Sequence, residues 1–258
     1  MHLHAKKYGS DNNPPLIILH GLFGSLDNWA GQSNVLAEDY QVWALDLRNH
    51  GRSGWDDDTS YAAMSDDLLQ FIDAQGFDRI LLLGHSMGGK VAMQFALDHP
   101  HRLQKLIVVD IAPVLYPPHH NDVFAGLNAV DLSTLGSRRD ADVQLESAIT
   151  EPSIRQFLLK NLYRDSDQFA WRMNLAALES GYDQTAAAPE PRGDNARYSG
   201  PTLFIKGERS HYIEPQYRDA IAALFPCAEA RIMTAVGHWP HAEKPKAFNA
   251  LITRFLKK

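Results

Sequence analysis

The sequence predicts an α/β protein with a mostly parallel sheet of about seven strands, helices on both faces and an inserted helical segment. Two observations predict this class. Short apolar runs alternate along the chain with stretches of helical periodicity, which is typical of a parallel sheet. Runs such as 16–19 and 106–109 are apolar at consecutive positions, as expected for strands that are buried on both faces.

The first expected strand is a short edge strand over 2–8, because the chain before Pro14 and Pro15 has room for one strand rather than a hairpin. The remaining strands are expected at 16–19, 42–46, 79–83, 106–109, 201–205 and 230–233. Helices are expected between them, at 60–75, 86–98, 214–224 and 244–257, and in a segment that Asp27 caps. Outside residues 114–198, the expected strands and helices therefore alternate along the chain.

Residues 114–198 interrupt the alternation. Their apolar side chains recur at helical spacing, and no run in this stretch has the composition of a buried strand. Prolines open the stretch, and a loose Ala, Pro, Gly and Asp segment at 186–200 closes it. We therefore expect a core formed by 1–113 and 199–258, with 114–198 as an inserted helical cap.

Composition excludes several classes of function. The chain of 258 residues has a net charge of −6, which gives no electrostatic support for nucleic-acid binding. Cys227 is the single cysteine, which favours a reducing compartment. The first ten residues lack a signal-peptide core, and no apolar run is long enough to span a bilayer. We expect a cytoplasmic protein with no membrane partner, as a monomer or small homo-oligomer.

The stretch 80–92 contains the pattern Gly-x-Ser-x-Gly at 84–88, between a buried strand and a helical pattern. This is the pattern of a nucleophile elbow, in which a strained strand-to-helix turn exposes a serine hydroxyl. The two glycines are needed because the neighbouring backbones approach closely. Ser86 is therefore the candidate nucleophile, although the pattern by itself also fits an ordinary glycine-rich turn.

A serine nucleophile needs a general base whose pKa lies near the working pH, and histidine meets this need. Ligands collect at the carboxyl ends of parallel strands, so the base is sought in the loops that follow strands. His238 follows the last expected strand, and His241 is its competitor three residues later. No spacing in the chain matches a metalloprotease motif, so no metal and no cofactor are expected.

Four motifs resemble the α/β-hydrolase family with a helical cap. They are His20-Gly21, the segments 46–53 and 84–89, and Gly237-His238. In most of that family the acid follows the strand corresponding to 201–205, at the position held here by Ser210, which carries no charge. Asp110, at the end of the preceding strand in apolar surroundings, is the alternative acid, and Glu208 is the reserve candidate.

In more detail the chain resembles the small bacterial YbfF-type esterases, on segments 20–28, 47–51, 86–90, 109–113 and 237–245. The resemblance implies a Ser–Asp–His esterase formed by Ser86, Asp110 and His238 that acts on short acyl esters and acyl-CoA thioesters. We expect the backbone N–H groups of Leu22 and Met87 to form the oxyanion hole, with Phe23 as a substitute for Leu22.

The substrate is expected to be a small acyl ester or acyl-CoA. The apolar side chains expected to line its pocket are Phe23, Phe124, Phe157, Trp171 and Trp239. Two other classes of function remain open on the same residues. One is a carbon–carbon bond hydrolase or cofactor-free lyase that uses the same triad, and the other is a non-enzymatic small-molecule receptor. Turnover of p-nitrophenyl esters discriminates between these classes and an esterase.

Overall fold

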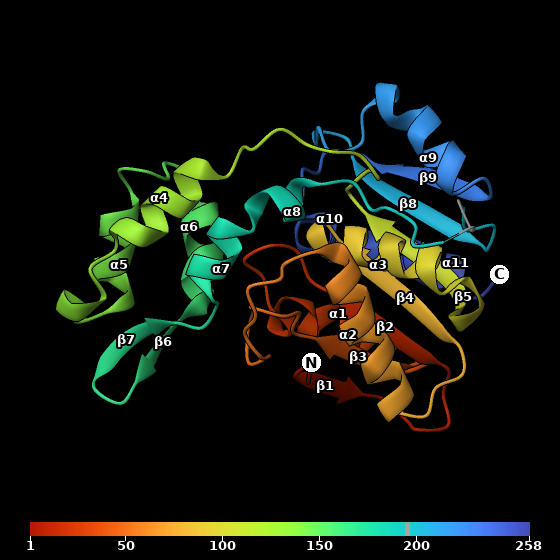
Figure 1. Ribbon diagram of the computed structural model, residues 1–258, viewed down its shortest axis with the longest axis horizontal. Helices are drawn as coiled ribbons and strands as arrows, with labels where there is room; N and C mark the ends of the chain where they lie inside the picture. Colours follow the sequence, from red (N-terminus) through yellow and green to blue (C-terminus); the bar gives the residue numbers. More distant parts are fainter. Residues whose placement is uncertain (194–196) are drawn as a thin grey trace.

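The computed structural model describes residues 1–193 and 197–258. Residues 194–196 belong to the predicted loose segment 186–200 and lie outside the described residues. Seven strands form one sheet in the order β1-β3-β2-β4-β5-β8-β9 (Figure 1). The prediction of a mostly parallel seven-stranded sheet is confirmed, since only the pairing of β1 with β3 is antiparallel.

The strands lie close to their expected positions. Their bounds are β1 Ala5–Tyr8, β2 Pro15–Leu19, β3 Gln41–Leu45, β4 Ile80–His85, β5 Leu103–Val109, β8 Thr202–Gly207 and β9 Ala228–Met233. Successive side chains along β2 enter opposite faces of the sheet: Ile17 and Leu19 join one buried cluster, whereas Leu16 and Ile18 join the other. Both faces of the central strands are therefore buried, as the consecutive apolar positions predict.

Helices cover both faces. On one face α2 (Tyr61–Ala74), α3 (Met87–Asp98) and α9 (Arg218–Leu224) pack on the sheet, and α2 and α3 lie in front of it in Figure 1. On the other face lie α1 (Ala30–Leu36) and α11 (Pro245–Leu256), which contact each other. A short helix, α10 (Pro240–Glu243), precedes α11. Asp27 was expected to cap the first helix, but the N-cap is Ser25. Ser25 and Asn28 form a capping box at the start of the 3-10 turn Leu26–Trp29.

The chain between β5 and β8, residues 114–198, is called the insert below. It extends to the left of the sheet in Figure 1. Its helices are α4 (Asn121–Ala129), α5 (Arg138–Leu145), α6 (Pro152–Leu158), α7 (Leu175–Ser180) and α8 (Tyr182–Ala186). They share a hydrophobic cluster that includes Leu127, Leu145 and Leu158. The insert thus has a buried core of its own.

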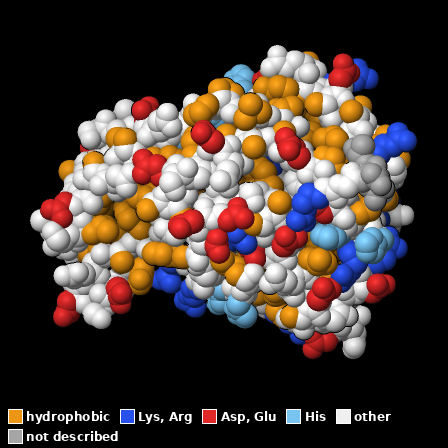
Figure 2. Space-filling view, viewed as in Figure 1, with side chains coloured by type: hydrophobic (Ala, Val, Ile, Leu, Met, Phe, Trp, Pro, Cys, Tyr) orange, Lys and Arg blue, Asp and Glu red, His pale blue; other side chains and the backbone are white. Residues whose placement is uncertain are grey.

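The insert also contains an antiparallel hairpin, β6 (Leu162–Asp165) and β7 (Gln168–Trp171), where only helices were expected. Each strand is four residues long and mostly half-buried or exposed. Such strands show neither the apolar run of a buried strand nor enough residues for a clear alternation. On the face seen in Figure 2, hydrophobic side chains gather over part of the insert, whereas charged side chains of both signs are interspersed over the core.

Candidate active site

Ser86 occupies the turn between β4 and α3 with φ 53° and ψ −122°, a conformation that L-residues rarely adopt. Two glycines permit the close contacts of this turn. A Cβ atom at Gly84 would lie 2.1 Å from the Gly88 carbonyl oxygen, and one at Gly88 would lie 2.3 Å from the His20 carbonyl oxygen. The turn therefore has the strained geometry of a nucleophile elbow, with Ser86 half-buried and lining a cavity.

Asp110 follows β5 directly with φ 55°, and its carboxylate is completely buried. Three donors satisfy it. The Gly207 N–H lies 2.8 Å from Oδ1, the Ser210 hydroxyl donates to Oδ2, and the His238 Nδ1 lies 2.7 Å from Oδ2. The Ser210 hydroxyl thus bonds to the carboxylate of the neighbouring strand from the position where most of the resembled family carries its acid. A buried carboxylate is stable here because each oxygen accepts a hydrogen bond.

His238 lies in the loop after β9. Since an ionised carboxylate can only accept hydrogen bonds, the contact with Asp110 places the proton of the neutral ring on Nδ1 and leaves Nε2 as an acceptor. The Tyr212 ring stacks on the imidazole, with ring centroids 4.1 Å apart. The His85 ring bonds to the His238 carbonyl oxygen at 2.8 Å. Ring and backbone of His238 are therefore both held in place.

The structure brings His238, and not His241, to Asp110. The His241 ring is buried and stacks on Trp29 with ring centroids 4.2 Å apart, and burial lowers the pKa of His241 to about 3. Glu208, the reserve acid, instead accepts the Ala235 N–H at 2.7 Å. Among the described residues the Ser86 hydroxyl makes no hydrogen bond, and in ligand-free enzymes the bond between nucleophile and base often forms only with substrate.

The loop after β2 contains the expected oxyanion donor. Phe23 donates its N–H to the His50 Nε2 at 3.2 Å, so this group is already occupied. In the described part of the chain the Leu22 N–H has no protein acceptor, and the Met87 N–H begins α3, where helix geometry provides no partner. The geometry thus favours Leu22 over Phe23 as the partner of Met87.

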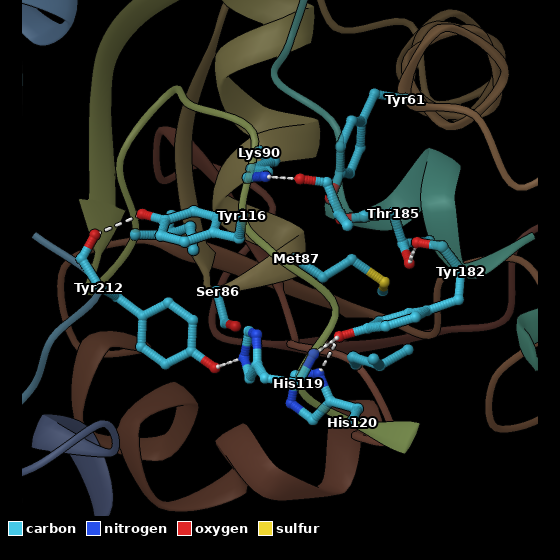
Figure 3. A pocket seen from close by; sticks show the side chains of 13 residues that line it. Tyr61, Ser86, Met87, Lys90, Tyr116, His119, His120, Tyr182, Thr185 and Tyr212 are labelled. Carbon is cyan, nitrogen blue, oxygen red and sulfur yellow. Dashed lines mark hydrogen bonds between the residues drawn. The ribbon is translucent and has the colours of Figure 1, made fainter. Parts of the chain in front are cut away.

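A cavity lies beside Ser86, and its lining contains more polar groups than the sequence predicts (Figure 3). The lining contains four tyrosines, two histidines and a lysine: Tyr61, Lys90, Tyr116, His119, His120, Tyr182 and Tyr212. Lys90 lies in the first turn of α3, four residues after Ser86, and this closeness in sequence could have identified it.

None of the five residues expected to line the pocket borders this cavity. Phe23 and Phe124 are 4% and 2% exposed, because their rings pack against each other inside the insert with centroids 5.1 Å apart. Phe157 instead contacts Trp239, with ring centroids 6.0 Å apart. Trp171 belongs to the rim of the insert's cluster. Apolar character alone does not distinguish a pocket wall from the core of the insert.

Lys90 is 1% exposed, and burial lowers its pKa to about 7. Its ammonium group donates to the carbonyl oxygens of Ala186 at 2.8 Å and Ala187 at 2.5 Å. It also lies 4.6 Å from the centroid of the Tyr116 ring. These contacts join α3, which follows Ser86, to the end of α8, so residues of the core and of the insert together line the cavity.

A family model described as the alpha/beta hydrolase fold matches residues 14–245. This chain belongs to the α/β-hydrolase fold family. Within that fold, the sn-1-specific diacylglycerol lipase ABHD11 of Mus musculus is 40% identical over 256 residues, which are 96% of this chain and 82% of the mouse protein. Esterase YbfF of Escherichia coli is 40% identical over 247 residues, which are 95% of this chain and 94% of that protein.

The solved structure of a marine microorganism esterase shares this α/β-hydrolase fold with a TM-score of 0.94. It is 39% identical, and the match covers 98% of both chains. Within residues 1–193 and 197–258, no helix combines the length and the apolar character needed to cross a bilayer.

Proposed function

We propose that this protein hydrolyses carboxylic esters through an acyl-enzyme formed on Ser86. It is an ester hydrolase of the α/β-hydrolase family, as are the relatives named esterase and lipase. The observation that carries the mechanism is the bond of 2.7 Å between His238 and the buried Asp110, which leaves Nε2 as an acceptor at the strand ends where Ser86 also lies.

In the first step Nε2 of His238 takes the proton of the Ser86 hydroxyl as its oxygen attacks the ester carbonyl. The oxyanion accepts hydrogen bonds from the Leu22 and Met87 N–H groups, and one such donor contributes about 3–4 kcal/mol to transition-state stabilisation. Asp110 stabilises the imidazolium that results. The imidazolium protonates the leaving alcohol, the carbonyl re-forms, and water then hydrolyses the acyl-enzyme with His238 as base.

We extend this proposal to acyl-CoA thioesters, because a thiolate leaves the same tetrahedral intermediate without a new catalytic group. The insert is proposed to cap the site, which is supported by the contribution of His119, His120 and Tyr182 to the cavity wall. A cytoplasmic location stays a prediction from cysteine content. A panel of p-nitrophenyl esters, acyl-CoAs and diacylglycerols would rank the acyl donors.

Ser86→Ala tests the mechanism. We expect turnover of p-nitrophenyl butyrate to fall by about 10³-fold or more, because the attacking oxygen is removed. Sustained wild-type turnover in this variant would contradict the assignment of Ser86. A stoichiometric burst without turnover in the wild type would instead favour a receptor, and turnover of carbon–carbon substrates alone would favour the hydrolase or lyase alternative.

A further inference from the structure

Two loops of the core contain a non-glycine residue in the left-handed region beside the proposed oxyanion hole. Phe23 has φ 60° and Asn49 has φ 64°. Asparagine tolerates this conformation, whereas for a bulky residue it is strained. Phe23 lies in the turn closed by the Gly24 N–H and the Gly21 carbonyl oxygen, at the position where such turns normally have glycine. The turn therefore needs support from outside.

The insert supplies that support through two asparagines. Asn161 is 3% exposed, and its Nδ2 donates to the Phe23 carbonyl oxygen at 2.7 Å. Asn174 donates its backbone N–H to the Asn49 carbonyl oxygen at 2.9 Å, and its Nδ2 lies 3.2 Å from the Asn49 Oδ1. Asn161 and Asn174 thus each bind one of these two residues, Phe23 and Asn49.

His50 joins the two loops to each other. It follows Asn49 directly, and its Nε2 accepts the Phe23 N–H at 3.2 Å. Burial lowers the pKa of His50 to about 3, so the ring stays neutral and Nε2 stays an acceptor at neutral pH. The Phe23 side chain completes the arrangement, since it packs in the hydrophobic cluster of the insert. The N–H, the carbonyl oxygen and the ring of Phe23 are all held.

We propose that Asn161 is a positioning residue for ester hydrolysis, which holds Phe23 in its left-handed conformation and thereby directs the Leu22 N–H at the oxyanion. Asn174 has the same role for the loop that contains His50. The insert then acts on catalysis itself, besides covering the site. This inference rests on the proposed function, because it requires that Leu22 donates to an oxyanion.

Asn161→Ala tests the inference, with Asn128→Ala as the matched control. Asn128 lies in the same insert, but it is exposed and its Nδ2 bonds to the Glu179 carboxylate. Because displaced catalytic groups cost up to about 10²-fold in rate, we expect kcat for p-nitrophenyl butyrate to fall about 10- to 100-fold in Asn161→Ala. KM should change less than about twofold, and Asn128→Ala should match the wild type.

A second readout separates positioning from general destabilisation. The affinity of a trifluoromethyl ketone, which forms an oxyanion on the nucleophile, should fall by the same factor as kcat/KM. Urea unfolding identifies a variant that fails to fold, in which case Asn161→Leu serves as the second variant with the same expectations, because leucine has a similar size but no donor for the Phe23 carbonyl oxygen. A wild-type kcat in either folded variant, or loss of folding in both, would overturn the inference.

The failure of this inference differs from the failure of the proposed function. If Ser86→Ala abolishes turnover while the asparagine variants keep the wild-type kcat and inhibitor affinity, only the positioning role is wrong. If Ser86→Ala retains turnover, the proposed mechanism is wrong, and the role of Asn161 falls with it.

Discussion

Asp110 accepts a hydrogen bond from a neutral side chain, the Ser210 hydroxyl. Its carboxylate is buried at the end of β5, and the Ser210 hydroxyl reaches it from the end of β8. A second carboxylate at residue 210 would face Asp110 across this bond, and two like charges so close in a buried site would repel strongly. A neutral donor at residue 210 is therefore compatible with an acid on β5, whereas a second charge is not.

Asp110→Asn should lower kcat/KM for p-nitrophenyl butyrate by about 10³- to 10⁴-fold, because an amide that donates to the His238 Nδ1 favours the wrong tautomer. Glu208→Gln is the matched control. It keeps an oxygen that can accept the Ala235 N–H, so we expect activity within about twofold of the wild type. A damaging Glu208→Gln and a mild Asp110→Asn would reverse the assignment.

At the scale of elements, α3 follows the proposed nucleophile Ser86 directly and also holds the returning end of the insert. Lys90, Gln94 and Asp98 follow each other at intervals of four residues, so they share one face of this helix. Lys90 binds the carbonyl oxygens after α8, Gln94 exchanges two hydrogen bonds with the Glu190 backbone, and Asp98 pairs with Arg192. The same helix thus fixes Ser86 and the segment that borders its cavity.

The elbow between β4 and α3 depends on its glycines. In Gly84→Ala the new Cβ would lie 2.1 Å from a backbone oxygen that cannot rotate away, so we expect a loss of about 3 kcal/mol or more in the free energy of unfolding. Gly31→Ala is the control, because within the described residues no atom outside its chain neighbours and its own helix backbone would lie within 4 Å of the new Cβ.

In α1 the Gly31→Ala substitution should raise stability by about 0.5–1 kcal/mol through the better helix propensity of alanine. Urea unfolding of both variants measures the difference. Equal stabilities of Gly84→Ala and the wild type would show that the turn does not need the close approach that the structure contains.

Across the whole molecule, four histidines are buried in the core and neutral: His20, His50, His85 and His241. Burial lowers the pKa of His20 to about 4, those of His50 and His241 to about 3, and that of His85 well below its usual value. Below about pH 6.5 the unfolded chain binds protons at these sites that the folded chain does not. The free energy of unfolding is therefore unaffected by these histidines above about pH 6.5, and it decreases as the pH falls below this value.

We expect each of these histidines to cost about 1.4 kcal/mol of unfolding free energy per pH unit below about 6.5, down to its folded pKa. Urea unfolding between pH 7.5 and 4.5 measures the slope. His241→Phe keeps an aromatic ring against Trp29 and removes one titratable group. The unfolding free energy of this variant should therefore change less steeply with pH than that of the wild type. Parallel curves for the two proteins would contradict this origin of acid sensitivity.

Much of the architecture follows from local patterns in the chain. The seven strands and the strand-to-helix turn at Ser86 were predictable, because each depends on residues that are neighbours in sequence. The absence of a charge at residue 210 was enough to direct attention to Asp110. The hairpin of the insert was not predictable, because its four-residue strands carry too few residues for a period to show.

Tertiary structure alone decided the surroundings of Ser86. The sequence shows that Phe23 and Phe124 are apolar, but only the folded chain shows that both rings belong to the hydrophobic cluster of the insert. Tyrosines, histidines and Lys90 line the cavity instead. The contacts of Asn161 with Phe23 and of Asn174 with Asn49 join residues more than a hundred positions apart. Sequence patterns extend over a few residues, whereas such contacts depend on how the whole chain returns on itself.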